Sequence, residues 1–425
     1  MRFTSLLLVA LLVGVCSAQL AHQGKWTPLG QPSSRVHRLP LQSNDDLVAT
    51  VAQDSKVGGY IFGQPLDFKL RSLDSGFWTL LSNGDRVWTL TIESEGALSL
   101  GVTFRRFVIP EGGELYIIGA KNTRGAFTSL NNPKVGSQLT TWPVEGSSIT
   151  LEYYQPASVK DLPTFEIVKV THGFKPLAYG DSGACNNNAV CDTGAWANEI
   201  RSSGMLLSGF GSRFCSGGLV NNANNDGDQL FLTAFHCSVD SADQIMFNYQ
   251  SASCTPNRDG PTDAIVGGIT VLARNANSDF AIVRIGDVIP AAWNVYLSGI
   301  SGVNTPPTSM VGIHHPSGDI KKISYANKAG IPTRWTVAEP GMWHWQISSW
   351  DDGTTEPGSS GSPLYDQNKR VVGQLHGGAA SCSNVAYDSY GATWASWANG
   401  LGAFIDPRGT GNLLINGTEL NTVRF

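Results

Sequence analysis

Three short segments of this chain each carry one side chain of the set that makes an alcohol nucleophilic. His236 follows an apolar stretch, Asp279 precedes another, and Ser360 stands in the glycine-flanked segment 358–361. A serine hydroxyl is a weak nucleophile at neutral pH, so it needs an imidazole to take its proton and a carboxylate to orient that imidazole. Each segment alone is weak evidence for catalysis, but together they predict a catalytic triad of His236, Asp279 and Ser360.

The glycines around Ser360 have a chemical use of their own. Because they lack a Cβ, Gly358 and Gly361 allow a tight turn in which backbone N–H groups converge on one point. The amides of Gly358 and Ser360 are therefore predicted to form an oxyanion hole, which would stabilise the charge that develops on a carbonyl oxygen under attack.

The order of the three residues along the chain favours one known architecture. Histidine, then aspartate, then serine is the chymotrypsin-like order, which differs from the other two common orders. Runs of β-type residues at 216–220, 229–234, 279–284 and 370–375 alternate with turns. They predict a double β-barrel within residues 180–406, with each barrel contributing part of the triad to a cleft between them.

The first half of the chain predicts a separate β domain, because 425 residues are too many for one compact unit. Residues 86–92, 114–118 and 148–154 alternate apolar and polar side chains between turn signals, which indicates a β-sandwich. No catalytic constellation is visible there, so residues 19–179 are expected to be a propeptide or accessory domain. The stretch 158–183, with its prolines and glycines, is expected to be the linker.

Composition supports an all-β soluble protein. Hydrophobic residues make up 41% of the chain and charged residues 15%, and glycine is abundant at 48 residues. The net charge of −5 argues against nucleic acid as a partner. At the C-terminal end, residues 394–405 are expected to form a short closing helix, and residues 407–425 a loose tail.

The N-terminus predicts export. Arg2 is followed by an apolar run from Leu6 to Val15 and then by small residues up to Ala18. This is the pattern of a secretory signal peptide over residues 1–18, and the run is too short to span a bilayer. We therefore expect a secreted, extracellular protein that has no membrane association after the signal is removed.

The cysteines fit an oxidising compartment. Removing the signal peptide leaves six, an even count that suggests three disulfides, and spacing alone leaves fifteen pairings open. Neither their spacing nor any His-Glu-x-x-His motif indicates a metal site, and no cofactor is expected. The six are Cys185, Cys191, Cys215, Cys237, Cys254 and Cys382.

Residues 180 to about 400 resemble the lysyl endopeptidases of the trypsin-like superfamily. The resemblance rests on the segments around His236, Asp279 and Ser360 and on further matches, which are Gly-Asp-Ser-Gly-Ala-Cys at 180–185, Cys-Ser-Gly-Gly-Leu-Val at 215–220, His-His-Pro-Ser-Gly-Asp at 314–319, Glu-Pro-Gly-Ser-Ser-Gly-Ser-Pro at 356–363 and Gly-Gln-Leu-His-Gly-Gly at 373–378. It implies a secreted serine endopeptidase that hydrolyses peptide bonds after lysine, with His236 as the general base, Asp279 orienting it and Ser360 as the nucleophile.

Further roles follow from the resemblance. It implies Asp388 as the carboxylate at the base of the primary specificity pocket, and His376 with Trp335 as the stacked pair that favours lysine over arginine. It also implies three disulfides, which pair Cys185 with Cys382, Cys191 with Cys254, and Cys215 with Cys237.

Activation must differ from that of trypsin, where a new N-terminal ammonium pairs with the aspartate before the nucleophile. Here that position is the uncharged Ser359. We therefore hypothesise that residues 19–179 are a pro-segment whose removal, before about Gly180, uncovers the cleft.

Other functions stay open at this point. The same site in a trypsin-like enzyme would accept arginine as well as lysine. A catalytically silent, secreted binding protein would use the N-terminal sandwich instead, and a metalloenzyme is a third alternative. The expected partners are protein or peptide substrates, and the protein is expected to be a monomer.

Overall fold

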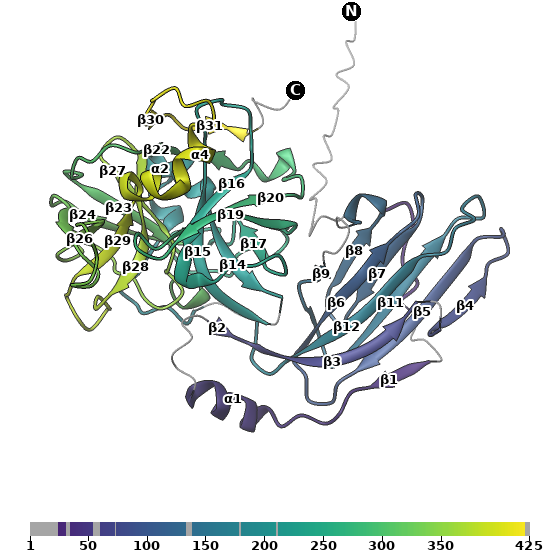
Figure 1. Cartoon of the computed structure of the whole chain (residues 1–425). Helices are drawn as coiled ribbons and strands as arrows, with labels where there is room; N and C mark the ends of the chain where they lie inside the picture. The colour runs from purple at the N-terminus through teal and green to yellow at the C-terminus, as the bar shows by residue number, and fades with distance from the viewer. Residues whose placement is uncertain are drawn as a thin grey trace, which may run out of the picture.

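The computed structural model describes residues 24–30, 35–53, 60–72, 74–132, 138–177, 180–209 and 211–420. The predicted signal peptide at 1–18 lies outside these residues. Within them most of the regular elements are strands, in a purple-to-teal N-terminal part and a largely green-to-yellow C-terminal part (Figure 1). No helix of the described residues has the length and apolar character needed to cross a membrane.

Two sheets form the predicted N-terminal sandwich. The first has strand order β1-β5-β11-β7-β8, with β4 on β5, and the second has β10-β6-β12-β3, with β9 on β6. Their bounds are β1 Val36–Arg38, β3 Gly63–Arg71, β4 Phe77–Leu80, β5 Arg86–Glu93, β6 Ser99–Val108, β7 Glu114–Ile118, β8 Thr123–Phe127, β9 Gln138–Thr140, β10 Val144–Glu145, β11 Ser148–Gln155 and β12 Thr164–Gly173.

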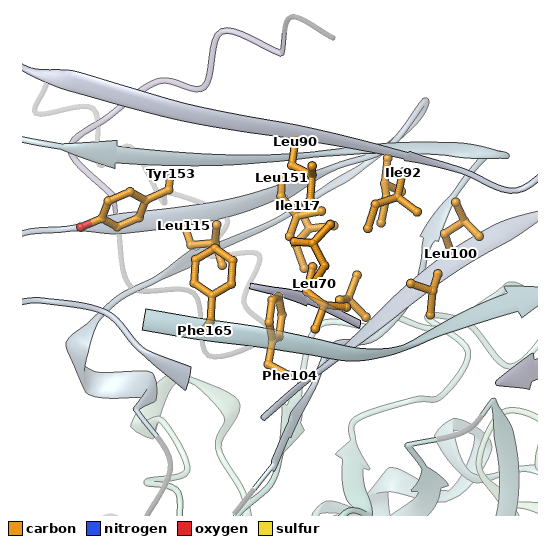
Figure 2. Packing of buried hydrophobic residues seen from close by; sticks show 14 of the residues in the cluster. Leu70, Leu90, Ile92, Leu100, Phe104, Leu115, Ile117, Leu151, Tyr153 and Phe165 are labelled. Atoms are coloured by element: carbon orange, nitrogen blue, oxygen red, sulfur yellow. The ribbon is translucent and has the colours of Figure 1, made fainter. Parts of the chain in front are cut away.

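The core of the sandwich lies between the two sheets. Figure 2 shows Leu90 and Leu151 of one sheet on the same cluster as Phe104 and Phe165 of the other. These side chains are at most 1% exposed. Each Å² of apolar surface that is buried contributes about 25 cal/mol to the free energy of folding. This core therefore stabilises the N-terminal domain whether or not the domain has an active site.

The predicted linker at 158–183 is wrong over residues 164–173. Its residues 164–173 form β12, which pairs with both β6 and β3 and is a central strand of its sheet. Pro163 stands just before the strand, where a missing N–H does not interrupt the ladder. Residues 165–167 and 170–173 of this strand are buried, so its packing outweighs the flanking prolines.

Two larger sheets form the double barrel. The first has order β18-β17-β14-β15-β16-β20-β19 and the second β13-β24-β23-β27-β28-β29-β26-β25, with β22 and β30 added. Their bounds are β13 Asn187–Asn188, β14 Ser203–Ser208, β15 Ser212–Val220, β16 Leu230–Ala234, β17 Gln244–Phe247, β18 Ile265–Val266, β19 Ile269–Asn275, β20 Phe280–Ile285, β22 Gly299–Ser301, β23 Met310–His314, β24 Lys322–Ala326, β25 Ile331–Thr333, β26 His344–Ile347, β27 Pro363–Asp366, β28 Arg370–Gly378, β29 Asp388–Ala392 and β30 Leu414–Ile415.

The expected loose tail after residue 407 is instead packed on the barrels. Its residues 414–415 form β30 on β22, and β31 (Thr418–Glu419) pairs with β21 (Tyr296–Leu297). Ile415 and Leu420 are 4% and 0% exposed, so apolar burial holds this segment down. Short α-helices complete the fold of the described residues: α1 Asn44–Gln53, α2 Thr193–Ser202, and α3 Thr393–Ser396 with α4 Gly402–Ile405 where the closing helix was predicted.

The N-terminal domain packs on the first barrel. Its strand β2 (Tyr60–Ile61) pairs with β15, and Arg124 forms an ion pair with Asp263 at 2.7 Å. Phe62 and Trp142 enter a cluster with residues of β14 and β17. No hydrogen bond, ion pair or ring contact between the described residues joins this domain to His236, His376 or Asp388, so the hypothesis that its removal uncovers the cleft gains no support from the structure.

A buried lysine gives the protease domain a pH-dependent stability. The side chain of Lys321 is fully buried, donates to the carbonyl oxygen of Ile200 at 2.6 Å, and burial lowers its pKa to about 7. In the unfolded chain the same group keeps its proton up to about pH 10.4. Because the unfolded state then binds more protons, the free energy of unfolding is expected to rise as pH increases from about 7 to about 10.

Replacing Lys321 by methionine is expected to remove this contribution. Lys321→Met should exceed the wild type in stability most clearly at pH 7, and the margin should shrink towards pH 10. Denaturant unfolding at a series of pH values measures it, with Lys328→Met as the control because Lys328 is a surface residue with 56% of its side chain exposed. Parallel stability curves for wild type and Lys321→Met across this range would contradict the prediction.

Candidate active site

Asp279 and His236 meet where two neighbouring strands begin and end. Asp279 directly precedes β20, and His236 lies in the single turn that follows β16, the strand paired with β20. One carboxylate oxygen of Asp279 lies 2.8 Å from Nδ1 of His236, and the other accepts the His236 amide at 3.0 Å. The ring and its backbone are therefore held by the same carboxylate.

The environment of Asp279 is nearly closed to solvent. Its side chain is 1% exposed, and burial raises the pKa of the carboxyl, while the hydrogen bonds from His236 act in the opposite direction. Its backbone has φ of +52°, a left-handed conformation that is uncommon for a residue other than glycine. This local strain is tolerated where the surrounding hydrogen bonds fix the residue.

Ser360 lies in the turn before β27, and this turn packs against the strand that leads to His236. A Cβ added to Gly361 would lie 2.2 Å from Oγ1 of Thr233, so only glycine allows this approach. The carbonyl oxygen of Ser360 accepts the amide of Ser216 in the first barrel at 2.8 Å. Within the described residues, no hydrogen bond joins the Ser360 hydroxyl to the His236 ring.

The amides of the serine turn are not used equally. The amides of Ser359 and Gly361 donate to backbone carbonyls at 3.0 and 2.8 Å. Over the described part of the chain, those of Gly358 and Ser360 have no acceptor. Gly358 has φ of +92°, which a residue with a side chain rarely adopts. The two amides predicted to form the oxyanion hole are thus the two that the turn leaves available.

An internal hydrogen bond holds the residue before Ser360. The hydroxyl of Ser359 lies 2.8 Å from Nδ1 of His314 and accepts the Glu356 amide at 3.2 Å. His314 is fully buried, and burial lowers its pKa to about 3, so its ring is neutral. The turn is therefore fixed by neutral groups at the position where trypsins place an ion pair.

The segment after residue 179 is bound by two carboxylates next to this turn. Asp319 accepts the amide of Gly180 at 2.9 Å, and Glu356 accepts the amide of Gly183 at 3.0 Å. Glu356 also accepts from the hydroxyl of Ser317 at 3.1 Å. The start of the predicted protease domain is thus tied to the residue that leads into the serine turn and to the loop after β23.

Asp388 stands at the start of β29, buried to 1% exposure. Its Oδ2 accepts from Nε1 of Trp350 and from Oγ1 of Thr355, both at 2.7 Å. A Cβ added to Gly378, its partner on β28, would lie 2.1 Å from its Oδ1. Burial raises the pKa of the Asp388 carboxyl, and its hydrogen bonds oppose that shift. None of its hydrogen bonds reaches His376 or Trp335.

Three rings stack at the edge of the site. The ring of His376 lies between Trp335, with centroids 3.9 Å apart, and His236, with centroids 5.5 Å apart. Burial lowers the pKa of His376 to about 3, so this second imidazole is neutral. Nitrogen and oxygen atoms of His236, Asp279 and His376 lie within 4.8 Å of one another, a set of metal-ligand type, but the carboxylate already bonds to His236.

Sequence reasoning missed two residues beside this stack. Nε2 of His344, the first residue of β26, lies 2.9 Å from Nδ1 of His376. Glu339 lies 3.4 Å from the other nitrogen of His344 and accepts the Trp335 amide at 2.8 Å. His344 could have been found from the sequence as a histidine within a strand. Glu339 could not, because it lies in a loop without any local motif.

The three predicted disulfides are confirmed. They join Cys185 to Cys382, Cys191 to Cys254, and Cys215 to Cys237, with Cα atoms 5.5, 4.8 and 6.2 Å apart. The last of them ties β15 to the turn that carries His236. Each such bridge typically contributes about 2–4 kcal/mol to stability.

A class of enzyme follows from these barrels and this site: the chain is a serine-type endopeptidase with a chymotrypsin-like fold. The profile of the C-terminal domain of lysyl endopeptidase matches residues 179–391, half of the chain. The chain is 28% identical over 344 residues to a lysyl endopeptidase of Pseudomonas aeruginosa, covering 72% of this chain and 71% of that protein. The chain belongs to the lysyl endopeptidase family.

Solved structures with a similar backbone are also proteases. They include the active form of the Rv3671c protease from M. tuberculosis, 16% identical over 54% of this chain and 92% of that chain with a TM-score of 0.34. Another is the HtrA-type protease AlgW with a tripeptide, 14% identical over 50% of this chain and 63% of that chain with a TM-score of 0.33. At these TM-scores the likeness adds nothing to the fold described above.

Proposed function

We propose that this protein hydrolyses peptide bonds on the carboxyl side of lysine by acyl transfer through Ser360. The observation that carries the proposal is the buried Asp388 carboxylate on β29. It is paired with the end of β28 that holds His376, whose ring stacks on His236. A site for a cation therefore lies beside the proposed catalytic residues.

In the proposed reaction, Ser360 attacks the substrate carbonyl while His236 accepts the hydroxyl proton through Nε2. The hydrogen bond from Nδ1 of His236 to Asp279 fixes the tautomer that leaves Nε2 free to do so. His236 then protonates the leaving amine, and water repeats the sequence on the acyl-enzyme. The absence of a Ser360–His236 hydrogen bond does not oppose this, because catalytic hydrogen bonds are often loose without substrate.

Charge on the carbonyl oxygen is held by the amides of Gly358 and Ser360. Both are without acceptors in the described structure, so no existing bond must break when the oxyanion forms. Removal of one such donor typically costs about 10²- to 10³-fold in kcat.

Lysine preference comes from charge and from the shape of the stack. A carboxylate in surroundings of low dielectric attracts a cation far more strongly than one in water. The stacked rings of Trp335 and His376 offer an apolar wall to the aliphatic stem of lysine, and the neutral His376 adds no repulsion of the ammonium.

We further propose that residues 1–18 direct secretion and that residues 19–179 are a pro-segment preceding a protease domain of residues 180–406. The tight binding of Gly180 and Gly183 by Asp319 and Glu356 supports a domain that begins there. The packing of the N-terminal domain on β14, β15 and β17 suggests that it assists folding of the first barrel.

Mass spectrometry of a protein mixture digested by the purified enzyme tests the function. The expected new termini follow lysine, and digestion by Ser360→Ala prepared in parallel serves as the blank. Cleavage after arginine at equal frequency would replace the proposal with a general trypsin-like specificity. The same measurement on the secreted enzyme gives its own N-terminus, which is expected near Gly180.

A further inference from the structure

A second acid–imidazole pair lies next to the proposed triad. His344 is fully buried, and its Nδ1 lies 3.4 Å from Oε2 of Glu339, which is itself only 8% exposed. On its other side, Nε2 of His344 lies 2.9 Å from Nδ1 of His376. Glu339, His344 and His376 thus form a line of polar groups that ends at the ring stacked on His236.

The protonation of His344 follows from its neighbours. Burial lowers the pKa of His344 to about 4 and that of His376 to about 3, so each neutral ring carries a single N–H at pH 7. Within the described residues Nδ1 of His344 has no hydrogen-bond partner, and the carboxylate of Glu339 lies 3.4 Å from it. A lone pair this close to a buried carboxylate would be repelled, whereas an N–H is attracted. Nδ1 of His344 therefore carries the proton.

The tautomer of His376 is fixed in turn. Because Nε2 of His344 is then an acceptor, the 2.9 Å contact requires Nδ1 of His376 to be the donor. The Asp279 carboxylate, 3.7 Å from the same nitrogen, favours the same assignment because it is negatively charged. This leaves Nε2 of His376 with a lone pair, on the side of the ring away from both of these partners.

We propose that Glu339 and His344 are positioning residues that hold His376 in its Nδ1–H tautomer, so that its Nε2 accepts a hydrogen bond from the substrate ammonium. This rests on the proposed lysine specificity. An ammonium is a compact charge with three N–H donors and needs several acceptors, whereas a planar guanidinium bonds best to one carboxylate in two parallel bonds. An added acceptor at His376 therefore favours lysine over arginine.

Glu339 has a second positioning role. The same Oε2 accepts the amide of Trp335 at 2.8 Å, so the loop that carries the indole is anchored to the group that orients His344. One carboxylate therefore fixes both members of the Trp335–His376 stack. A glutamine at this position can place its carbonyl oxygen at the same point, and it is the conservative replacement.

Imidazole nitrogen NMR tests the tautomers directly. The full chain carrying Ser360→Ala and nitrogen-15-labelled histidine avoids autolysis, and His344→Gln and His376→Gln variants assign the signals. At pH 7 the single ring proton of His344 and that of His376 are each expected on Nδ1. A His376 ring protonated on Nε2 would overturn the proposal, whatever the enzyme proves to cleave, so this outcome is distinct from a failure of the proposed function.

Kinetics test the consequence. Replacement of His344 by phenylalanine removes the acceptor, and kcat/KM for a lysine substrate is expected to fall about 10- to 100-fold, the value of one hydrogen bond to a charged group. The fall in kcat/KM should be smaller for the matched arginine substrate. The single variants His344→Gln and Glu339→Gln should keep most of the wild-type lysine preference. Val288→Gln, at an exposed position of the first barrel, is the control. An equal fall in kcat/KM for both substrates, or a loss of lysine preference in the two amide variants as large as in His344→Phe, would show a merely structural role.

Discussion

Replacement of Ser360 by alanine is expected to lower kcat for peptide hydrolysis by about a millionfold, as removal of the nucleophile does in a comparable triad. Stability should hardly change, because the Ser360 hydroxyl has no hydrogen-bond partner in the described structure, and the bonds that hold the turn, such as that from the Ser216 amide to the Ser360 carbonyl oxygen, involve other groups. Steady-state kinetics on a lysine substrate and thermal unfolding measure the two effects separately.

A fluorophosphonate probe gives an independent readout. It should label the wild type and the control Ser309→Ala, in which a serine outside the site is changed, and fail to label Ser360→Ala. Labelling of Ser360→Ala at the wild-type rate, or its continued hydrolysis of peptides, would show that another residue is the nucleophile. An unlabelled wild type would favour the silent binding protein.

The meeting of His236 and Asp279 could be predicted from the sequence because each residue lies at a strand boundary that the pattern reveals. The apolar run before His236 and the one after Asp279 are β16 and β20, which are adjacent and antiparallel. Adjacent antiparallel strands bring the end of one beside the beginning of the next, so the imidazole and carboxylate meet. The glycines around Ser360 likewise reveal a turn whose close packing allows no Cβ.

Other features depend on contacts that leave no local signal. Glu339 acts through a nitrogen of His344 and an amide of Trp335, and only the path of the loop before β26 brings these groups together. Strand β12 was mistaken for a linker because flanking prolines outweighed a modest alternation, although pairing on both edges makes it central. Motifs whose residues are close in sequence can be predicted. Residues that only contact a site residue cannot, because tertiary packing brings them there.

Replacement of Asp388 by asparagine is expected to reduce kcat/KM for lysine substrates by about 30- to 4,000-fold, the range for losing one partner of a buried charge pair worth about 2–5 kcal/mol. The hydrogen bonds explain why an isosteric change has so large an effect. Trp350 and Thr355 both donate to Oδ2 of Asp388, so asparagine must place its carbonyl oxygen there. Its NH2 group then occupies the position of Oδ1 and presents donors to an ammonium that needs acceptors.

Folding should survive this change, because asparagine keeps the hydrogen bonds from Trp350 and Thr355, loses at most the one from the Ala380 amide, and removes a buried charge whose desolvation is unfavourable. Labelling of Ser360 by a fluorophosphonate should persist as well, since the triad lies outside the altered hydrogen bonds. Asp351→Asn, a surface carboxylate 3.7 Å from Lys328, is the control and should keep full activity. If Asp388→Asn cleaved lysine substrates like the wild type, Asp388 would not be the group that binds the cation. If labelling were lost as well, the change would have disturbed the whole site, and specificity would have to be read from a different variant of the pocket.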